Sequence, residues 1–137
     1  MLVQKNWEEA GGIPYAIDRT DEDLTLKQIT EAAIDVLMKD NKKGFFLMLE
    51  GGRIDWAAHA NDAATTIKEV VDMDEAIRVA YEFYKKHPKE TLIVITADHD
   101  TGGVTVGQGR LNITSLQYQS QSQDILSKRI NALRESK

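Results

Sequence analysis

The sequence contains no cysteine and only two prolines among its 137 residues. The lack of cysteine excludes disulfide bonds and thiolate ligands, so any metal ion must be held by histidine, aspartate or glutamate. No apolar run approaches the roughly 20 residues that a membrane-spanning helix needs. Basic residues are scattered, aromatic residues make up only 7%, and the net charge is −5. We therefore expect neither a nucleic-acid partner nor a membrane partner.

Hydrophobic residues make up 42% of the chain and charged residues 28%, which is typical of one globular domain. Residues 1–23 carry the chain breakers Gly11, Gly12 and Pro14 and are expected to form an irregular lead-in. The first residues also lack a basic stretch followed by an apolar one, so no signal peptide is expected within them.

Helical periodicity marks three segments. Residues 25–40 begin with Thr25 and Gln28, which fit a capping box. Residues 62–86 form the longest amphipathic pattern, which His87 and Pro88 should end. Residues 108–137 are predicted to be a polar loop followed by a closing amphipathic helix.

Two apolar runs of strand length lie at residues 44–50 and 91–97. Neither run alternates with polar residues, which is typical of parallel strands that are buried on both faces. Two such strands joined by the helix of residues 62–86 would form a right-handed βαβ unit within residues 24–107. We therefore predict an α/β fold, a three-layer sandwich with a mainly parallel sheet. The helix should pack on that sheet by Ile67, Val70 and Ile77.

Acidic and imidazole side chains follow both predicted strands. Glu50, Asp55 and His59 come after the first, and Asp98 and His99 after the second. Ligands of open α/β sheets collect beyond the carboxyl ends of the strands, so the two groups should face one another. Asp55 and His59 lie four residues apart, which places both on one face of a helical turn. Carboxylate and imidazole groups suit zinc, whereas Glu50 would suit a harder ion such as magnesium.

Each pair also has an ordinary interpretation. An Asp-x-x-x-His spacing occurs often by chance, and Asp-His after a strand often makes only loop hydrogen bonds. The conjunction of both pairs with Glu50 at two strand ends favours a metal site. His87, beside Pro88 at a predicted helix end, is instead expected to be a solvated residue.

Two long motifs carry a family resemblance. The strings F-F-L-M-L-E-G-G-R-I-D-W-A-A-H (residues 45–59) and T-A-D-H-D-T-G-G (residues 96–103) resemble the alkaline phosphatase family, as does E-V-V-D-M-D-E-A between them. The resemblance covers about residues 13–107. It implies a large α/β fold with two zinc ions and one magnesium ion at the sheet edge.

Site roles follow from the resemblance. Asp55 and His59 would bind the first zinc ion, Asp98 and His99 the second, and Glu50 the magnesium ion. Trp56 occupies a position that varies in the family and would tune the surroundings of the metals and phosphate. Arg53 is not the arginine that binds phosphate in the family.

The implied activity is phosphomonoester hydrolysis through a phosphoserine intermediate. The family's nucleophilic serine lies in an Asp-Ser-Ala type turn that this chain lacks, so no catalytic residue is assigned here. The chain's serines all lie outside the matched motifs: Ser115, Ser120, Ser122, Ser127 and Ser136. The chain is therefore interpreted as a fragment from the later half of such an enzyme, inactive alone. The resemblance also implies a periplasmic or extracellular location.

Two alternatives stay open at this point. The chain could belong to a phosphodiesterase or sulfatase of the same superfamily, although the E-G-G-x-I-D and T-A-D-H-x-T-G-G strings favour the monoesterase branch. It could also be a non-enzymatic metal-binding or interaction module that retains the motifs.

Overall fold

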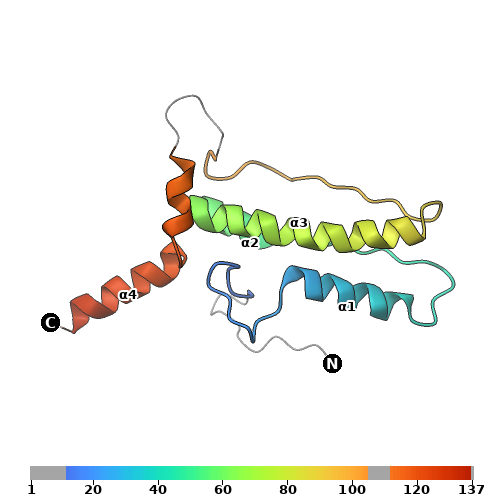
Figure 1. The fold of residues 1–137 in the computed structure, drawn as a ribbon, viewed down its shortest axis with the longest axis horizontal. Helices are drawn as coiled ribbons and strands as arrows, with labels where there is room; N and C mark the ends of the chain where they lie inside the picture. The colour runs from blue at the N-terminus through green and yellow to red at the C-terminus, as the bar shows by residue number, and fades with distance from the viewer. Residues whose placement is uncertain (1–11, 105–111, 137) are drawn as a thin grey trace.

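The computed structural model describes residues 12–104 and 112–136, and the described part consists of helices joined by irregular segments. Helix α3 is the long central element, α1 lies alongside it, and α4 extends away from both (Figure 1). The helices in chain order are α1 (Leu26–Met38), α2 (Gly52–His59), α3 (Ala63–Lys86), the 3-10 helix η1 (Ile113–Tyr118) and α4 (Gln123–Glu135).

The expected helix boundaries are largely confirmed because they depend on local signals. At the start of α1, Gln28 N–H donates to Thr25 Oγ1 over 3.1 Å, and Thr25 N–H donates to Gln28 Oε1 over 2.9 Å, which completes the predicted capping box. The helix expected at residues 62–86 is α3, with Asp62 as its N-cap and His87 as its C-cap.

The predicted α/β sandwich is wrong for this chain. Residues 44–50 and 91–97 form no strand in the described structure, so the parallel sheet and the βαβ unit are both absent from it. Phe46 and Leu92 are each 87% exposed. A strand needs a neighbouring backbone to pair its N–H and C=O groups, and the structure places helices beside these runs instead.

The predicted packing face of α3 is also wrong. Ile67 and Val70 are 46% and 50% exposed and Ile77 is half-buried, and α3 packs against α1 and α2 rather than against a sheet. Its buried positions carry small or polar side chains, namely Ala64, Thr65, Thr66, Glu69 and Ala76. Small side chains allow the helix backbones to approach closely, so the described core is built from alanine and threonine rather than from large aliphatic residues.

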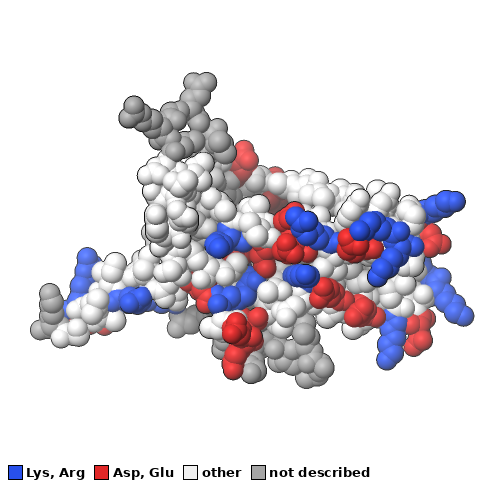
Figure 2. Space-filling view, viewed as in Figure 1, with Lys and Arg blue, Asp and Glu red and all other residues white. Residues whose placement is uncertain are grey.

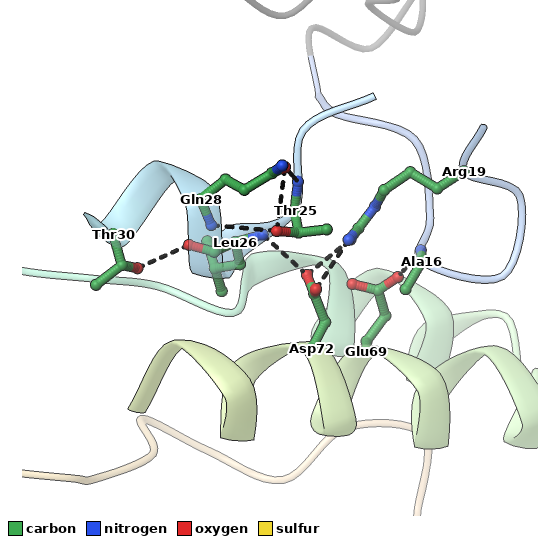
Figure 3. Close-up of polar contacts among 8 residues, drawn as sticks. All are labelled: Ala16, Arg19, Thr25, Leu26, Gln28, Thr30, Glu69 and Asp72. Atoms are coloured by element: carbon green, nitrogen blue, oxygen red, sulfur yellow. Dashed lines mark hydrogen bonds and ion pairs between the residues drawn. The ribbon is translucent and has the colours of Figure 1, made fainter. Parts of the chain in front are cut away.

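Carboxylates of α3 anchor the irregular lead-in (Figure 3). Arg19 forms a two-pronged ion pair with Asp72, at 2.8 and 2.7 Å, and Ala16 N–H donates to Glu69 Oε1 over 2.5 Å. Burial raises the pKa of Glu69, although the Ala16 hydrogen bond and the charge of Arg19 oppose the rise. These contacts join residues that are 53 positions apart.

Other charged groups lie at the surface, where both signs intermingle over α1 and α3 (Figure 2). Lys27 lies 3.9 Å from Glu75, and Arg78 lies 2.8 Å from Asp74, with all four side chains substantially exposed. Exposed ion pairs of this kind contribute at most about 1 kcal/mol each. The Arg19–Asp72 pair, whose side chains are only 9% and 11% exposed, therefore contributes more to how the lead-in docks than these surface pairs do.

The carboxylate of Asp62 holds the C-terminal segment. It accepts hydrogen bonds from Thr65 Oγ1, Gln119 Nε2 and Gln123 N–H, each over 2.7 Å. Ser122 N–H adds a bond of 2.8 Å to Asp18 Oδ1. The predicted closing helix is confirmed as α4, while η1 occupies part of the predicted polar loop.

Burial alone would raise the pKa of Asp62, but hydrogen bonds from Gln123, Thr65 and Gln119 outweigh it and hold the pKa below its ordinary value. A lowered pKa in the folded state means that the carboxylate stabilises the fold above its unfolded pKa of about 3.9. That stabilisation is lost as the pH falls through the lower, folded value.

We predict that Asp62→Asn destabilises the chain by about 1–3 kcal/mol at pH 7, because the amide NH₂ would face donors that need an acceptor. Urea denaturation followed by circular dichroism measures this difference. It should begin to shrink below about pH 4 and should be lost as the pH falls through the lower, folded pKa of Asp62. Asp74→Asn, which changes an exposed carboxylate of the same helix, should stay within about 0.5 kcal/mol. Equal effects of both variants would contradict the role of Asp62.

Candidate metal centre

Helix α2 positions the first candidate pair. Asp55 and His59 lie on one face of it, and His59 Nε2 is 3.5 Å from Asp55 Oδ1. Ala57 and Ala58 are buried on the same helix, and α2 packs against α3. The helical turn expected from the four-residue spacing is thus present, and its buried alanines fix the orientation of the half-buried Asp55 and the exposed His59.

The second candidate pair lies in a turn after the extended segment 91–97. His99 Nε2 is 3.3 Å from Asp98 Oδ2, and both side chains are mostly exposed. The main-chain carbonyl of Asp100 lies 3.1 Å from His99 Nδ1, on the opposite side of the ring. The imidazole therefore has one nitrogen engaged by the backbone and the other beside a carboxylate.

Thr101 links the two pairs. Its hydroxyl donates to Asp55 Oδ1 over 2.5 Å and lies 3.1 Å from His99 Nδ1. The next residue, Gly102, has a φ of +65°, and a Cβ built there would lie 2.0 Å from the carbonyl oxygen of Ala58. Sequence reasoning singled out neither residue, although both stand in the T-A-D-H-D-T-G-G motif.

Glu50 lies in a different environment. It lines a cavity of about 330 Å³ together with Arg53, Trp56, Glu69 and Asp72, and none of the other four ligand candidates lines it. Arg53 is buried, with its guanidinium carbon 4.7 Å from the ring centre of Tyr15 and 4.6 Å from that of Trp56. Trp56 thus stacks on Arg53 at the edge of the cavity that Glu50 shares.

The spacing within each pair fits a shared zinc ion. Ligands at about 2.0–2.2 Å from a tetrahedral zinc ion lie about 3.4 Å from one another. The Asp55–His59 and Asp98–His99 distances of 3.5 and 3.3 Å are close to that value. Among the described residues, however, no three or more His, Cys, Asp or Glu side chains gather closely enough to hold one ion. Each pair alone therefore offers two ligand candidates, fewer than a tetrahedral zinc site uses.

His87, by contrast, is a helix-end residue, as expected. It caps α3, stacks on Phe83 with ring centres 4.7 Å apart, and lies 3.9 Å from Glu90. It lies between the matched motifs rather than in one of them, and it provides a histidine that the candidate centre does not use.

The comparisons with known proteins define the family. The model of the alkaline phosphatase family matches residues 8–132, which is most of the chain. The chain belongs to the alkaline phosphatase family, a family of phosphomonoesterases. It is 53% identical over 97 residues to alkaline phosphatase 4 of Bacillus subtilis and 50% identical over 97 residues to alkaline phosphatase 3 of the same organism. It is also 40% identical over 102 residues to the repressible alkaline phosphatase of Saccharomyces cerevisiae.

These alignments cover about 70% of this chain but only 21%, 21% and 18% of the three relatives. The chain spans about one fifth of the length of the curated relatives that it matches.

We predict that Gly102→Ala destabilises the chain more than Gly103→Ala. Both glycines have φ near +65°, where an alanine is strained by about 1–2 kcal/mol. Only at Gly102 does the new Cβ also collide with a backbone atom, whereas nothing lies within 4 Å of it at Gly103. Thermal unfolding of the two variants compares them directly. Equal losses of stability would show that the Thr101–Gly102 turn is not seated against α2.

Proposed function

We propose that this chain is part of an alkaline phosphatase that hydrolyses phosphomonoesters with the help of two zinc ions and one magnesium ion. The observation that carries the proposal is the family match over residues 8–132, within which two Asp-His pairs have zinc-compatible spacing. As the resemblance to the family's motifs implies, Asp55 and His59 would hold the first zinc ion, Asp98 and His99 the second, and Glu50 the magnesium ion.

The chain's own residues would position the metals rather than attack the substrate. Zinc ions, when bound, supply Lewis-acid stabilisation of the attacking and leaving oxygens in an in-line phosphoryl transfer. Asp55 and Asp98 would add negative charge to the ligand sets, and His59 and His99 neutral nitrogen donors. Helix α2 holds the first pair at fixed spacing, and Thr101 connects it to the second.

The nucleophile is proposed to lie outside these residues. The described serines fall in η1, in α4, at its ends or in the linker between the two helices, and Ser122 serves as the N-cap of α4. A serine beside the metals, an arginine for the phosphate dianion and further metal ligands would therefore come from other parts of a longer enzyme. We propose a periplasmic or extracellular location for that enzyme. Among the described residues, no helix is long and apolar enough to cross a membrane.

We predict that the chain binds zinc weakly through its two pairs, since each pair supplies two of the usual three or four protein ligands. In isothermal titration calorimetry, the double variant His59→Ala/His99→Ala should abolish the zinc signal. His87→Ala removes the third histidine of the chain and should leave the signal unchanged. Zinc binding that survives in the double variant, or that His87→Ala abolishes, would contradict the proposed ligands.

We predict that the whole protein containing this chain hydrolyses p-nitrophenyl phosphate, and that the chain alone does not. In the whole protein, Asp98→Ala should lower kcat about a hundredfold or more, because a displacement of about 1 Å at the reacting centre has that effect. Glu50→Gln should be milder, since it perturbs only the magnesium ion. Asp74→Ala, at an exposed position of α3, serves as the control. Strong turnover by the chain alone, or a whole protein indifferent to Asp98→Ala, would overturn the proposed function.

A further inference from the structure

We propose that Thr101 is a positioning residue that couples the two Asp-His pairs. Its hydroxyl donates a hydrogen bond to the carboxylate of Asp55 in the first pair. The same hydroxyl oxygen also lies within hydrogen-bond distance of the imidazole of His99 in the second pair. This inference rests on the proposed function, because it assumes that both pairs bind zinc.

The direction of the hydrogen bonds follows from the groups involved. A carboxylate can only accept, so the single proton of the Thr101 hydroxyl goes to Asp55 Oδ1, 2.5 Å away. The hydroxyl oxygen then has only lone pairs to offer to His99 Nδ1, 3.1 Å away. The main-chain carbonyl of Asp100, also 3.1 Å from Nδ1, is likewise an acceptor.

These two acceptors match one tautomer of His99, the one that zinc binding requires. Asp98 Oδ2 is also an acceptor and faces Nε2, so the hydrogen bonds of the metal-free ring do not by themselves choose between the two nitrogens. A zinc ion between Nε2 and Asp98 would take the lone pair of Nε2, and the proton would then lie on Nδ1, where the two acceptors face it. Nε2 is the atom that lies 3.3 Å from Asp98 Oδ2, at the spacing of two ligands on one zinc ion. A second hydrogen bond that fixes the tautomer of a histidine ligand is a common feature of metal sites. Thr101 therefore presents the coordinating nitrogen of His99 and the carboxylate of Asp55 together.

The backbone next to Thr101 explains why its hydroxyl can contact Asp55 on helix α2. Gly102 packs against the end of α2, where no Cβ could be accommodated beside the Ala58 carbonyl. The Asp98–His99 turn is thereby held against the helix that carries Asp55. The link from Thr101 to Asp55 joins residues 46 positions apart.

Other threonines of the same segment behave differently. Thr96 Oγ1 donates only to the carbonyl of its neighbour Ala97, over 3.2 Å. The hydroxyl of Thr91 is buried without a hydrogen-bond partner. Of these three threonines, only Thr101 bridges two ligand candidates. Thr91 provides a matched substitution that removes a hydroxyl without breaking a contact.

The test uses the whole zinc-loaded protein with three variants: Thr101→Val, Thr101→Ser and Thr91→Val. Chelator competition measures the affinity of both zinc ions, and the visible absorption spectrum of the cobalt-substituted protein reports ligand geometry. We expect Thr101→Val to weaken both ions about 10- to 100-fold and to change the cobalt spectrum, as loss of a group that orients metal ligands does. Thr101→Ser keeps the hydroxyl and should restore both readouts. Thr91→Val should match the wild type.

The outcomes separate this inference from the proposed function. Wild-type zinc affinity and an unchanged cobalt spectrum in Thr101→Val would overturn the coupling while leaving the metal site intact. Weakening of one ion alone would show that Thr101 serves a single pair, which also contradicts the coupling. A wild-type protein that binds no zinc would overturn the metal site and the inference together. If circular dichroism shows that Thr101→Val is misfolded, Thr101→Ala removes the hydroxyl without added bulk and gives the same comparison.

Discussion

Carboxylates of α3 and of its N-cap hold the described structure together. Asp62 at the N-cap and Glu69 in the helix are buried, and Asp72 is largely buried. Each receives donors from a segment at least 53 positions away in the sequence. A buried carboxylate that loses its donors keeps its full desolvation cost, so these contacts specify one arrangement strongly. The lead-in and the C-terminal segment are thus placed relative to α3 mainly by directed polar contacts. The buried hydrophobic side chains among the described residues are four alanines and Tyr15.

Asp62 also affects the candidate metal centre, because it lies at the junction between α2 and α3. Asp62 N–H donates to the carbonyl of Ala57, and Asn61 N–H to that of Ala58, each over 3.0 Å. These bonds close the end of α2 directly against the start of α3, while the Asp62 side chain caps α3. The orientation of α2, and with it Asp55 and His59, is therefore set by the first turn of α3.

Local signals allowed sequence reasoning to predict the helices but not their packing. The capping box at Thr25, the helical turn of Asp55 and His59, and the end of α3 at His87 all depend on residues within four positions of one another. The prediction of two strands was wrong because a strand requires a neighbouring strand to pair with, which its own residues cannot specify. The prediction of the packing face of α3 was wrong because the buried Glu69 has its partners, Ala16 and Arg19, 50 or more positions away in the sequence. Thr101 was missed for the same reason: its partner Asp55 is remote in sequence.

The two ligand pairs consequently differ in how firmly the described chain holds them. Asp55 and His59 stand on a helix whose buried face packs on α3, and such elements position side chains more accurately than loops do. Asp98 and His99 follow an extended segment whose apolar side chains, such as Leu92, are largely exposed, so that segment alone cannot fix them. Their placement depends on the hydroxyl of Thr101 and on the contact of Gly102 with α2. The second pair thus takes its geometry from the first, which is why one hydroxyl group can influence both Asp-His pairs.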